Sequence, residues 1–200
     1  EEGSFFQKYT DQLEWCPVLH GGKQYVAYVS AGKGNNMDIY IHEVNSKVHT
    51  RITSHFEVDE SPRWSPDGKS LVFVSARTGN GDIYMVEDIT KFLGKKQNRE
   101  IKGSFKRLTE NKNEDMLPAF SPNGRYLAFT ARTGGKRKRG PYTIALMDFK
   151  NKHKVKLFNN RIVNSKSHPS WSFDGHFVAY QISSDLKDRA VDIGVMQLKI

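Results

Sequence analysis

One eight-residue pattern recurs along the chain and constrains its fold more than any other feature. It runs Ser-Pro-Arg-Trp-Ser-Pro-Asp-Gly at residues 61–68, Leu-Pro-Ala-Phe-Ser-Pro-Asn-Gly at 117–124 and His-Pro-Ser-Trp-Ser-Phe-Asp-Gly at 168–175. A weaker copy, Cys-Pro-Val-Leu-His-Gly-Gly, occupies residues 16–22. Tandem units of roughly 40 to 50 residues are typical of solenoids and propellers, so the chain is predicted to be a repeat protein.

Each copy has the pattern of a small antiparallel sheet. A short strand containing Trp64, Phe120 or Trp171 leads into a turn rich in Pro, Asp or Asn, and Gly, and the apolar run that follows forms a second strand. That run is continuous rather than alternating, which indicates a sheet covered on both faces. Two further strands complete each unit, as the repeated Asp-Ile-Tyr at 38–40 and 82–84 indicates.

These features predict an all-β propeller of four-stranded antiparallel blades, in a single domain over residues 1–200. We expect the blades at about 14–53, 59–109, 115–158 and 165–200, with residues 4–10 supplying the strand that closes the last blade. A propeller of which these four blades are only a part is the alternative, and the sequence leaves it open.

Composition narrows the classes of function. The formal net charge is +9, and the basic excess lies between residues 130 and 170. It falls into two clusters, 136–139 and 150–156, which are expected on different sides of a blade, and no aromatic residues are interleaved with them as in single-strand nucleic-acid sites. Nucleic acid is therefore not the expected partner. No apolar stretch approaches the roughly 20 residues of a membrane span.

Motifs for catalysis and for metal binding were not found. The sequence has no GxSxG elbow, no phosphate-binding loop and no GxGxxG after a strand, and its seven histidines lack metal-ligand spacing. The lone Cys16 offers neither a disulfide nor a thiolate cage. We expect a protein that is not an enzyme and that has no cofactor or metal site.

Candidate binding residues lie in the loops that one side of a propeller would display. This side is built from the connections between second and third strands and from the segments that lead into each first strand. The cationic side chains on it that we consider candidates are those of Lys136, Arg137, Lys138, Arg139, Arg77 and Arg132. Four adjacent cations bounded by glycines can attract an acidic protein surface or an anionic polymer, so these residues are the predicted partner-binding set.

Carboxylates precede the repeat prolines and are expected at the rim of a central channel. They are Glu14, Asp59, Glu60, Glu114 and Asp115, and Lys166 takes the corresponding place in the last copy. A ring of carboxylates can hold a cation such as Ca²⁺. Arg77 and Arg132 are also well placed to pair with these acids, and we favour this structural role.

The repeat resembles the PD40 unit, which forms the blades of TolB-like propellers and of tricorn-type and prolyl-oligopeptidase-type peptidases. Segment 61–87, SPRWSPDGKSLVFVSARTGNGDIYMVE, carries the resemblance most clearly. It implies a non-catalytic interaction scaffold of the bacterial cell envelope, located in the periplasm, with an envelope lipoprotein or envelope complex as its protein partner. The alternatives are the substrate-gating propeller of a peptidase and a direct binder of an anionic polymer such as peptidoglycan.

Overall fold

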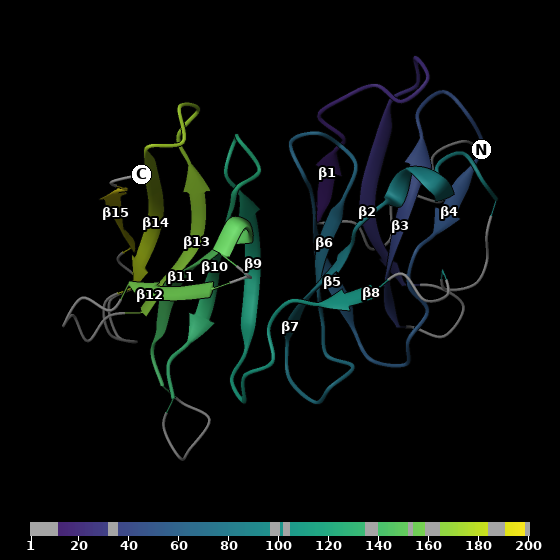
Figure 1. The fold of residues 1–200 in the computed structure, drawn as a ribbon. Helices are drawn as coiled ribbons and strands as arrows, with labels where there is room; N and C mark the ends of the chain where they lie inside the picture. The colour runs from purple at the N-terminus through teal and green to yellow at the C-terminus, as the bar shows by residue number, and fades with distance from the viewer. Residues whose placement is uncertain are drawn as a thin grey trace. The chain divides into compact units, whose positions relative to one another are not determined.

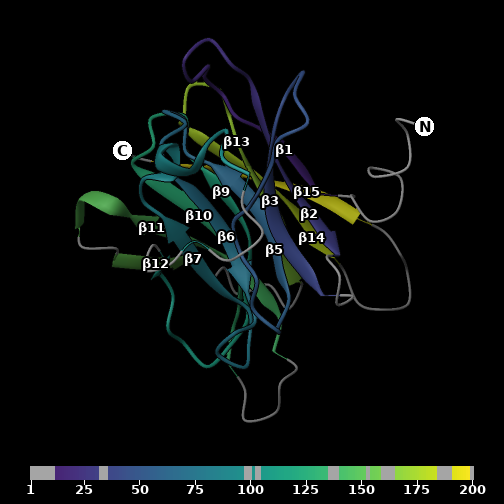
Figure 2. The ribbon, with the colours of Figure 1, turned by 90° about the vertical axis from the view of Figure 1, so that its right-hand side faces the viewer.

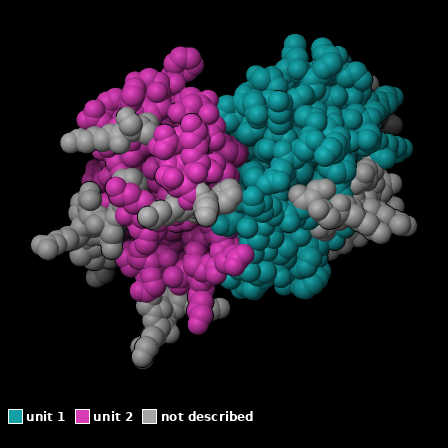
Figure 3. All heavy atoms as spheres, in the orientation of Figure 1, with its two compact units in different colours: residues 1–108 teal, residues 109–200 magenta. Residues whose placement is uncertain are grey.

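The computed structural model describes residues 12–31, 36–96, 101, 105–134, 140–151, 154–158, 165–183 and 191–198. The chain forms two compact units, residues 1–108 and residues 109–200, each of which contains two of the four repeats (Figure 3). The strand expected at 4–10 lies outside the described residues. Neither of the short helical segments in the described ranges has the length or apolar character to span a bilayer.

The first unit consists of two four-stranded antiparallel sheets in which the strands follow one another in chain order (Figure 1). The first sheet contains β1 (Leu13–Trp15), β2 (Tyr25–Ala31), β3 (Met37–Glu43) and β4 (His49–Arg51). The second contains β5 (Asp59–Trp64), β6 (Leu71–Ser75), β7 (Asp82–Val86) and β8 (Phe105–Arg107), with a short 3-10 helix at Ile89–Phe92. The predicted four-stranded repeat is confirmed here.

The second unit repeats this topology (Figures 1 and 2). Its first sheet contains β9 (Asp115–Phe120), β10 (Tyr126–Arg132), β11 (Tyr142–Asp148) and β12 (Lys154–Phe158), with a 3-10 turn at Phe149–Asn151. Its second sheet has three strands among the described residues: β13 (Ser165–Trp171), β14 (Phe177–Ser183) and β15 (Val191–Gln197). The all-β prediction is therefore confirmed in both units.

The repeated turn forms as its residues predict. The Ser65 hydroxyl donates to Asp67 Oδ1 at 2.6 Å, the same oxygen accepts the Lys69 N–H at 3.0 Å, and Gly68 adopts φ +66°. These bonds stabilise the charged carboxylate, and the first of them is the main cause of a lowered pKa for Asp67. The serine, the Asp or Asn, and the glycine repeat this arrangement at 121–124 and 172–175.

A β-bulge marks the residue before the repeat proline in three of the sheets. Ser61, Leu117 and His168 have φ of +53°, +52° and +54°, and the pairing of the first two strands shifts register at each of these sites. A left-handed backbone is uncommon for residues other than glycine, and proline cannot donate to a ladder. The motif therefore places one extra residue in the first strand of each of these sheets.

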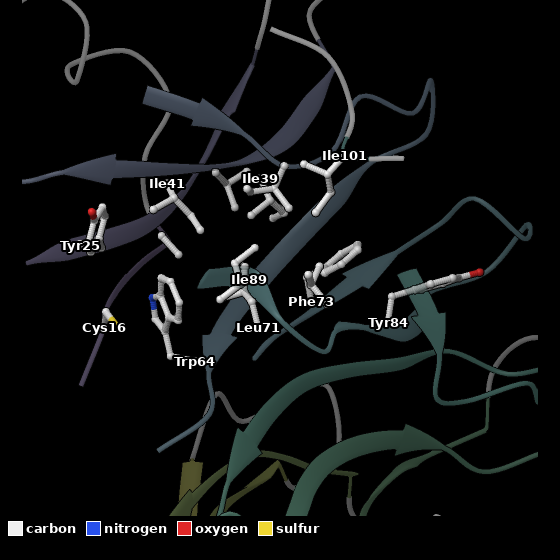
Figure 4. Close-up of a cluster of buried hydrophobic side chains, with 14 residues drawn as sticks. Cys16, Tyr25, Ile39, Ile41, Trp64, Leu71, Phe73, Tyr84, Ile89 and Ile101 are labelled. Atoms are coloured by element: carbon white, nitrogen blue, oxygen red, sulfur yellow. The ribbon is translucent and has the colours of Figure 1, made fainter. Parts of the chain in front are cut away.

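Within each unit, a tryptophan on the first strand of the second sheet joins that sheet to the sheet before it. The Trp64 indole N–H donates to the Glu14 carbonyl at 3.2 Å, and that of Trp171 donates to the Ala119 carbonyl at 2.9 Å. In the first unit the indole belongs to a buried cluster with Tyr25, Ile39 and Ile41 of one sheet and Leu71 and Phe73 of the other (Figure 4). Because the indole needs a partner for its N–H when buried, this bond fixes where the two sheets meet.

The register of the first sheet differs from the alignment that the sequence suggested. Trp15 pairs with Val26, as Trp64 pairs with Leu71, so Trp15 is the counterpart of Trp64. Pro17 lies after β1, in the connection to β2, where it is not part of a bulge. The Cys-Pro sequence at 16–17 therefore does not correspond to the Ser-Pro at 61–62, and Glu14 takes the register position of Arg63.

Replacing Trp64 tests the sheet-to-sheet joint. Trp64→Phe keeps most of the ring but loses the N–H, and we expect a loss of about 1 kcal/mol in the free energy of unfolding. Trp64→Ala also leaves a cavity and should cost about 3–5 kcal/mol. Urea unfolding measures both, with Phe173→Ala as the control, since Phe173 is exposed in a turn. Equal stability of Trp64→Ala and the control would contradict the joint.

Candidate partner-binding surface

The 54–58 loop, which leads into β5, carries an exposed phenylalanine on a braced backbone. The Asn36 side-chain amide donates to the carbonyls of His55 and Glu57, the latter at 3.1 Å. The Glu57 N–H donates to His55 Nδ1 at 3.1 Å, and the His55 and Phe56 rings lie 4.3 Å apart. Phe56 is 80% exposed, beside an exposed Val58. A large apolar side chain held in place in this way resembles the anchors of protein interfaces.

The sequence prediction missed Phe56 because this residue lies outside the repeat motif. A comparison of the loops at matching positions of the strand pairing would have identified it. Val58 and Glu114 hold equivalent places, since each accepts the N–H of the matching residue at the end of the second strand. Phe56 then corresponds to Lys112, so a large aromatic stands in a loop position where another repeat has a charged residue.

Arg77 pairs with the buried carboxylate of Asp59, the residue that directly follows this loop. Its guanidinium lies 3.3 Å from Asp59 Oδ2, donates to the Ser75 hydroxyl at 2.8 Å, and packs 4.9 Å from the centre of the Phe105 ring. Asp59 is fully buried, and the Arg77 side chain is largely covered. The predicted pairing of this arginine with a repeat carboxylate is confirmed. Most of its donors are engaged inside the sheet, which leaves little of Arg77 for a partner.

Arg132 pairs with a different acid although its sequence context is the same. It occupies the register position of Ala76, one residue earlier than Arg77, because the Arg132 N–H bonds to the carbonyl of Glu114 as that of Ala76 bonds to Val58. A shift of one residue turns a side chain to the other face of a strand. Arg132 therefore meets Glu114, with Nη1 3.1 Å from Oε2.

Tyr142 contacts both members of the Arg132–Glu114 pair. Its hydroxyl donates to Glu114 Oε2 at 3.1 Å and accepts from Arg132 Nη2 at 2.6 Å. Burial, reinforced by the bond to the carboxylate, raises the pKa of the phenol. The three side chains hold the end of β10 against the segment before β9, so Arg132 too has a structural role here.

The predicted rim acids do not share one environment. Asp59 and Asp115 are fully buried at matching register positions, whereas Glu60 and Glu114 are half-buried. Glu14 lies 3.7 Å from Arg63, and burial raises its pKa despite that cation. Because its register position is that of Arg63, Glu14 is not the counterpart of Asp59. No cluster of three or more potential metal ligands occurs among the residues that the structure describes.

Lys166 replaces the buried aspartate in the last sheet. Its register position on β13 is that of Asp59 on β5, and it is almost completely buried. The Nζ atom lies 5.5 Å from the centre of the Tyr180 ring, a cation–π arrangement. Burial lowers the pKa of this ammonium group. The exchange of an aspartate for a lysine that the sequence shows at this position thus lies in the interior of the sheet packing.

The cationic loop that the sequence singled out, Lys136, Arg137, Lys138 and Arg139, lies outside the described residues. Its role in binding stays a prediction. Gly134 and Pro141, on either side of it, are described. The bond from the Thr133 N–H to the Pro141 carbonyl, at 2.9 Å, brings the two ends of the loop together.

Comparison with known proteins agrees with the blade topology. Residues 12–187 match the profile of PD40, described as the TolB beta propeller domain. The chain belongs to this family. An uncharacterized protein of Agrobacterium fabrum is 29% identical over 150 residues, which cover 72% of this chain and 46% of that protein. The Tol-Pal system protein TolB of Helicobacter pylori is 26% identical over 144 residues, which cover 72% of this chain and 31% of that protein.

Solved structures show the same fold. TolB from Acinetobacter baumannii has a TM-score of 0.70 at 24% identity, covering 95% of this PD40 chain and 41% of that one. The tricorn protease has a TM-score of 0.59 at 15% identity, covering 87% of this chain and 17% of that one. The chain thus spans less than half the length of the two curated relatives named above, and sheets of this fold occur in the tricorn protease as well as in TolB.

Removing the Arg77 side-chain charge tests the buried pair. Arg77→Met leaves the Asp59 carboxylate buried without its guanidinium, and we expect a loss of about 3–5 kcal/mol in the free energy of unfolding. The control is Arg125→Met, whose partner Asp148 lies 3.0 Å away at the surface, and its loss should be much smaller. Urea unfolding at pH 7 measures both. Equal losses would contradict the buried role of Arg77.

Lys166 should make stability depend on alkaline pH. Because burial lowers its pKa, the folded state releases this proton at a lower pH than the unfolded chain does. The free energy of unfolding should therefore rise with pH between the lowered pKa and the ordinary value near 10.5. Urea unfolding of the wild type and of Lys166→Met at several pH values measures this slope. The proposal fails if the variant shows the same alkaline rise as the wild type.

Proposed function

We propose that this chain is a non-catalytic interaction component of the bacterial cell envelope, acting in the periplasm as TolB-type proteins do. The observation that carries the proposal is Phe56, an exposed aromatic residue on a braced loop of a rigid sheet scaffold. Relatives named as Tol-Pal system proteins support the envelope assignment. The predicted partner is a protein of the envelope, such as a peptidoglycan-associated lipoprotein.

The arrangement suits display rather than chemistry. Arg77, Arg132 and Tyr142 are engaged with Asp59 or Glu114, so they brace the loops. An interface needs an apolar anchor that is fixed before binding, because ordering a flexible side chain or loop lowers affinity. Phe56 supplies such an anchor. The cations of 136–139 add long-range attraction for an acidic partner in this proposal, which would raise the association rate.

A second candidate is the substrate-gating propeller of a peptidase, which the fold shared with the tricorn protease supports. The two functions differ in what accompanies the PD40 repeats. A native polypeptide that also carries a hydrolase domain with a GxSxG elbow would favour the peptidase. The mass of the protein in its own cells, measured by mass spectrometry after crosslinking, distinguishes the two.

Truncating Phe56 tests the proposed function. The soluble domain of a peptidoglycan-associated lipoprotein is passed over immobilised protein in biolayer interferometry. Phe56→Ser should weaken binding by about tenfold or more, as for an anchor residue at an interface. Its thermal stability should not change, because the side chain is exposed. Phe173→Ser is the matched control, since Phe173 is an exposed phenylalanine in a turn of the last sheet. Absence of binding by the wild type, or equal binding by both variants, would refute the proposal.

A further inference from the structure

The loop that displays Phe56 is closed by a hydrogen bond that requires a neutral imidazole. The Glu57 N–H donates to His55 Nδ1, with 3.1 Å between the two nitrogens. A backbone N–H can only donate, so His55 Nδ1 is the acceptor and carries no proton. The imidazolium form of histidine has an N–H at both ring nitrogens and accepts no hydrogen bond. Protonation of His55 therefore breaks this bond and sets two donors against each other.

This bond encloses the anchor residue. It joins His55 to Glu57, the residues on either side of Phe56, and the His55 and Phe56 ring centres lie 4.3 Å apart. The Asn36 side-chain amide donates to the carbonyls of the same two flanking residues. Asn36 thus holds acceptors of the loop, whereas His55 holds a donor. Loss of the histidine bond leaves the peptide between Phe56 and Glu57 without this restraint, so the orientation of the Phe56 ring is no longer fixed.

The charged groups on the elements around the loop do not oppose protonation of His55. They are the buried pairs Asp38 with Arg51 and Asp59 with Arg77, and the half-buried Glu57 and Glu60. In each buried pair the arginine offsets the charge of the carboxylate. The carboxylates of Glu57 and Glu60 favour an imidazolium close to them in the chain. His55 is only half-buried, so protons from the solvent reach it.

We propose that His55 is a pH-sensitive latch on the partner-binding loop, closed when the imidazole is neutral and open when it is protonated. Histidine changes its charge between roughly pH 5 and pH 8, so the latch acts in this range. This inference rests on the proposed function, because it takes Phe56 as the residue that contacts the partner. An anchor that is ordered before binding gives a higher affinity than a loose one, so acid should weaken capture of the partner.

The backbone amide of Glu57 reports the state of the latch without any partner. In proton–nitrogen NMR spectra of the wild type, its signal should shift between roughly pH 8 and pH 5 as the bond to His55 is lost. His55→Asn keeps an acceptor that does not titrate, because an asparagine side chain bonds the N–H two residues further on. The Glu57 signal of this variant should not follow the wild-type titration. His176→Asn is the matched control, since His176 is exposed in another sheet, and it should titrate as the wild type does.

An unchanging Glu57 signal in the wild type would overturn the latch. The same titration in His55→Asn as in the wild type would also overturn it, because another group would then be the cause.

Binding measured at two pH values connects the latch to capture of the partner. The probe is the soluble domain of a peptidoglycan-associated lipoprotein in biolayer interferometry, at about pH 7.5 and about pH 5.5, on either side of the ordinary histidine titration. On acidification the wild type should lose about two- to tenfold more affinity than His55→Asn, which corresponds to one hydrogen bond. His55→Leu has no acceptor and should already be weakened at the higher pH.

The outcomes separate this inference from the proposed function. Equal losses of affinity in the wild type and in His55→Asn would overturn the latch and leave Phe56 as the anchor. Absence of binding at both pH values would refute the proposed function, and the role of the latch in capture with it.

Discussion

The bond from a tryptophan indole to the main chain of the preceding sheet is the constraint on which each unit depends. The second strands of this protein are apolar on both faces, and a sheet of that kind is not stable alone in water. Trp64 and Trp171 solve the problem in the same way, by placing a large ring between two sheets and directing its N–H to one carbonyl. Burying a ring of this size contributes several kcal/mol, and the hydrogen bond adds the position at which the sheets meet.

Most of the fold could be predicted because the copies of the repeat share the same turn residues and the same apolar run. The Ser, Asp or Asn, and Gly of the turn, together with the apolar run after it, predicted the first two strands of each sheet. The first repeat was different. Pro17 resembles the repeat proline, but Trp15 pairs with Val26, 11 residues further along, whereas Trp64 pairs with Leu71, seven residues further along. The first hairpin therefore has a longer connection than the motif predicts. The alignment therefore failed where the motif was weakest.

The site was less predictable than the fold. Arg77 and Arg132 share the sequence Ala-Arg-Thr-Gly, and their pairing with repeat carboxylates was foreseen, but not the one-residue shift that gives them different partners. Side chains alternate between the two faces of a strand, so a shift of one residue brings the arginine to a different acid. The composition of the loop does not reveal this shift. Phe56 stands out only when the loop is compared at the register of the sheet. Lys166 was noticed as an exception in the sequence, and only the packing of β13 shows that it is buried.

The bulges before the repeat prolines have a consequence for the edges of the sheets. β5, β9 and β13 each lie at the edge of their sheet, and each combines a bulge with a proline that has no N–H to offer. Such an edge is a poor template for an incoming extended peptide. β1 is also an edge strand, but its three residues contain neither a proline nor a bulge. The protection against templated strand addition that the other three sheets carry is thus not found on β1, as far as the structure describes this strand.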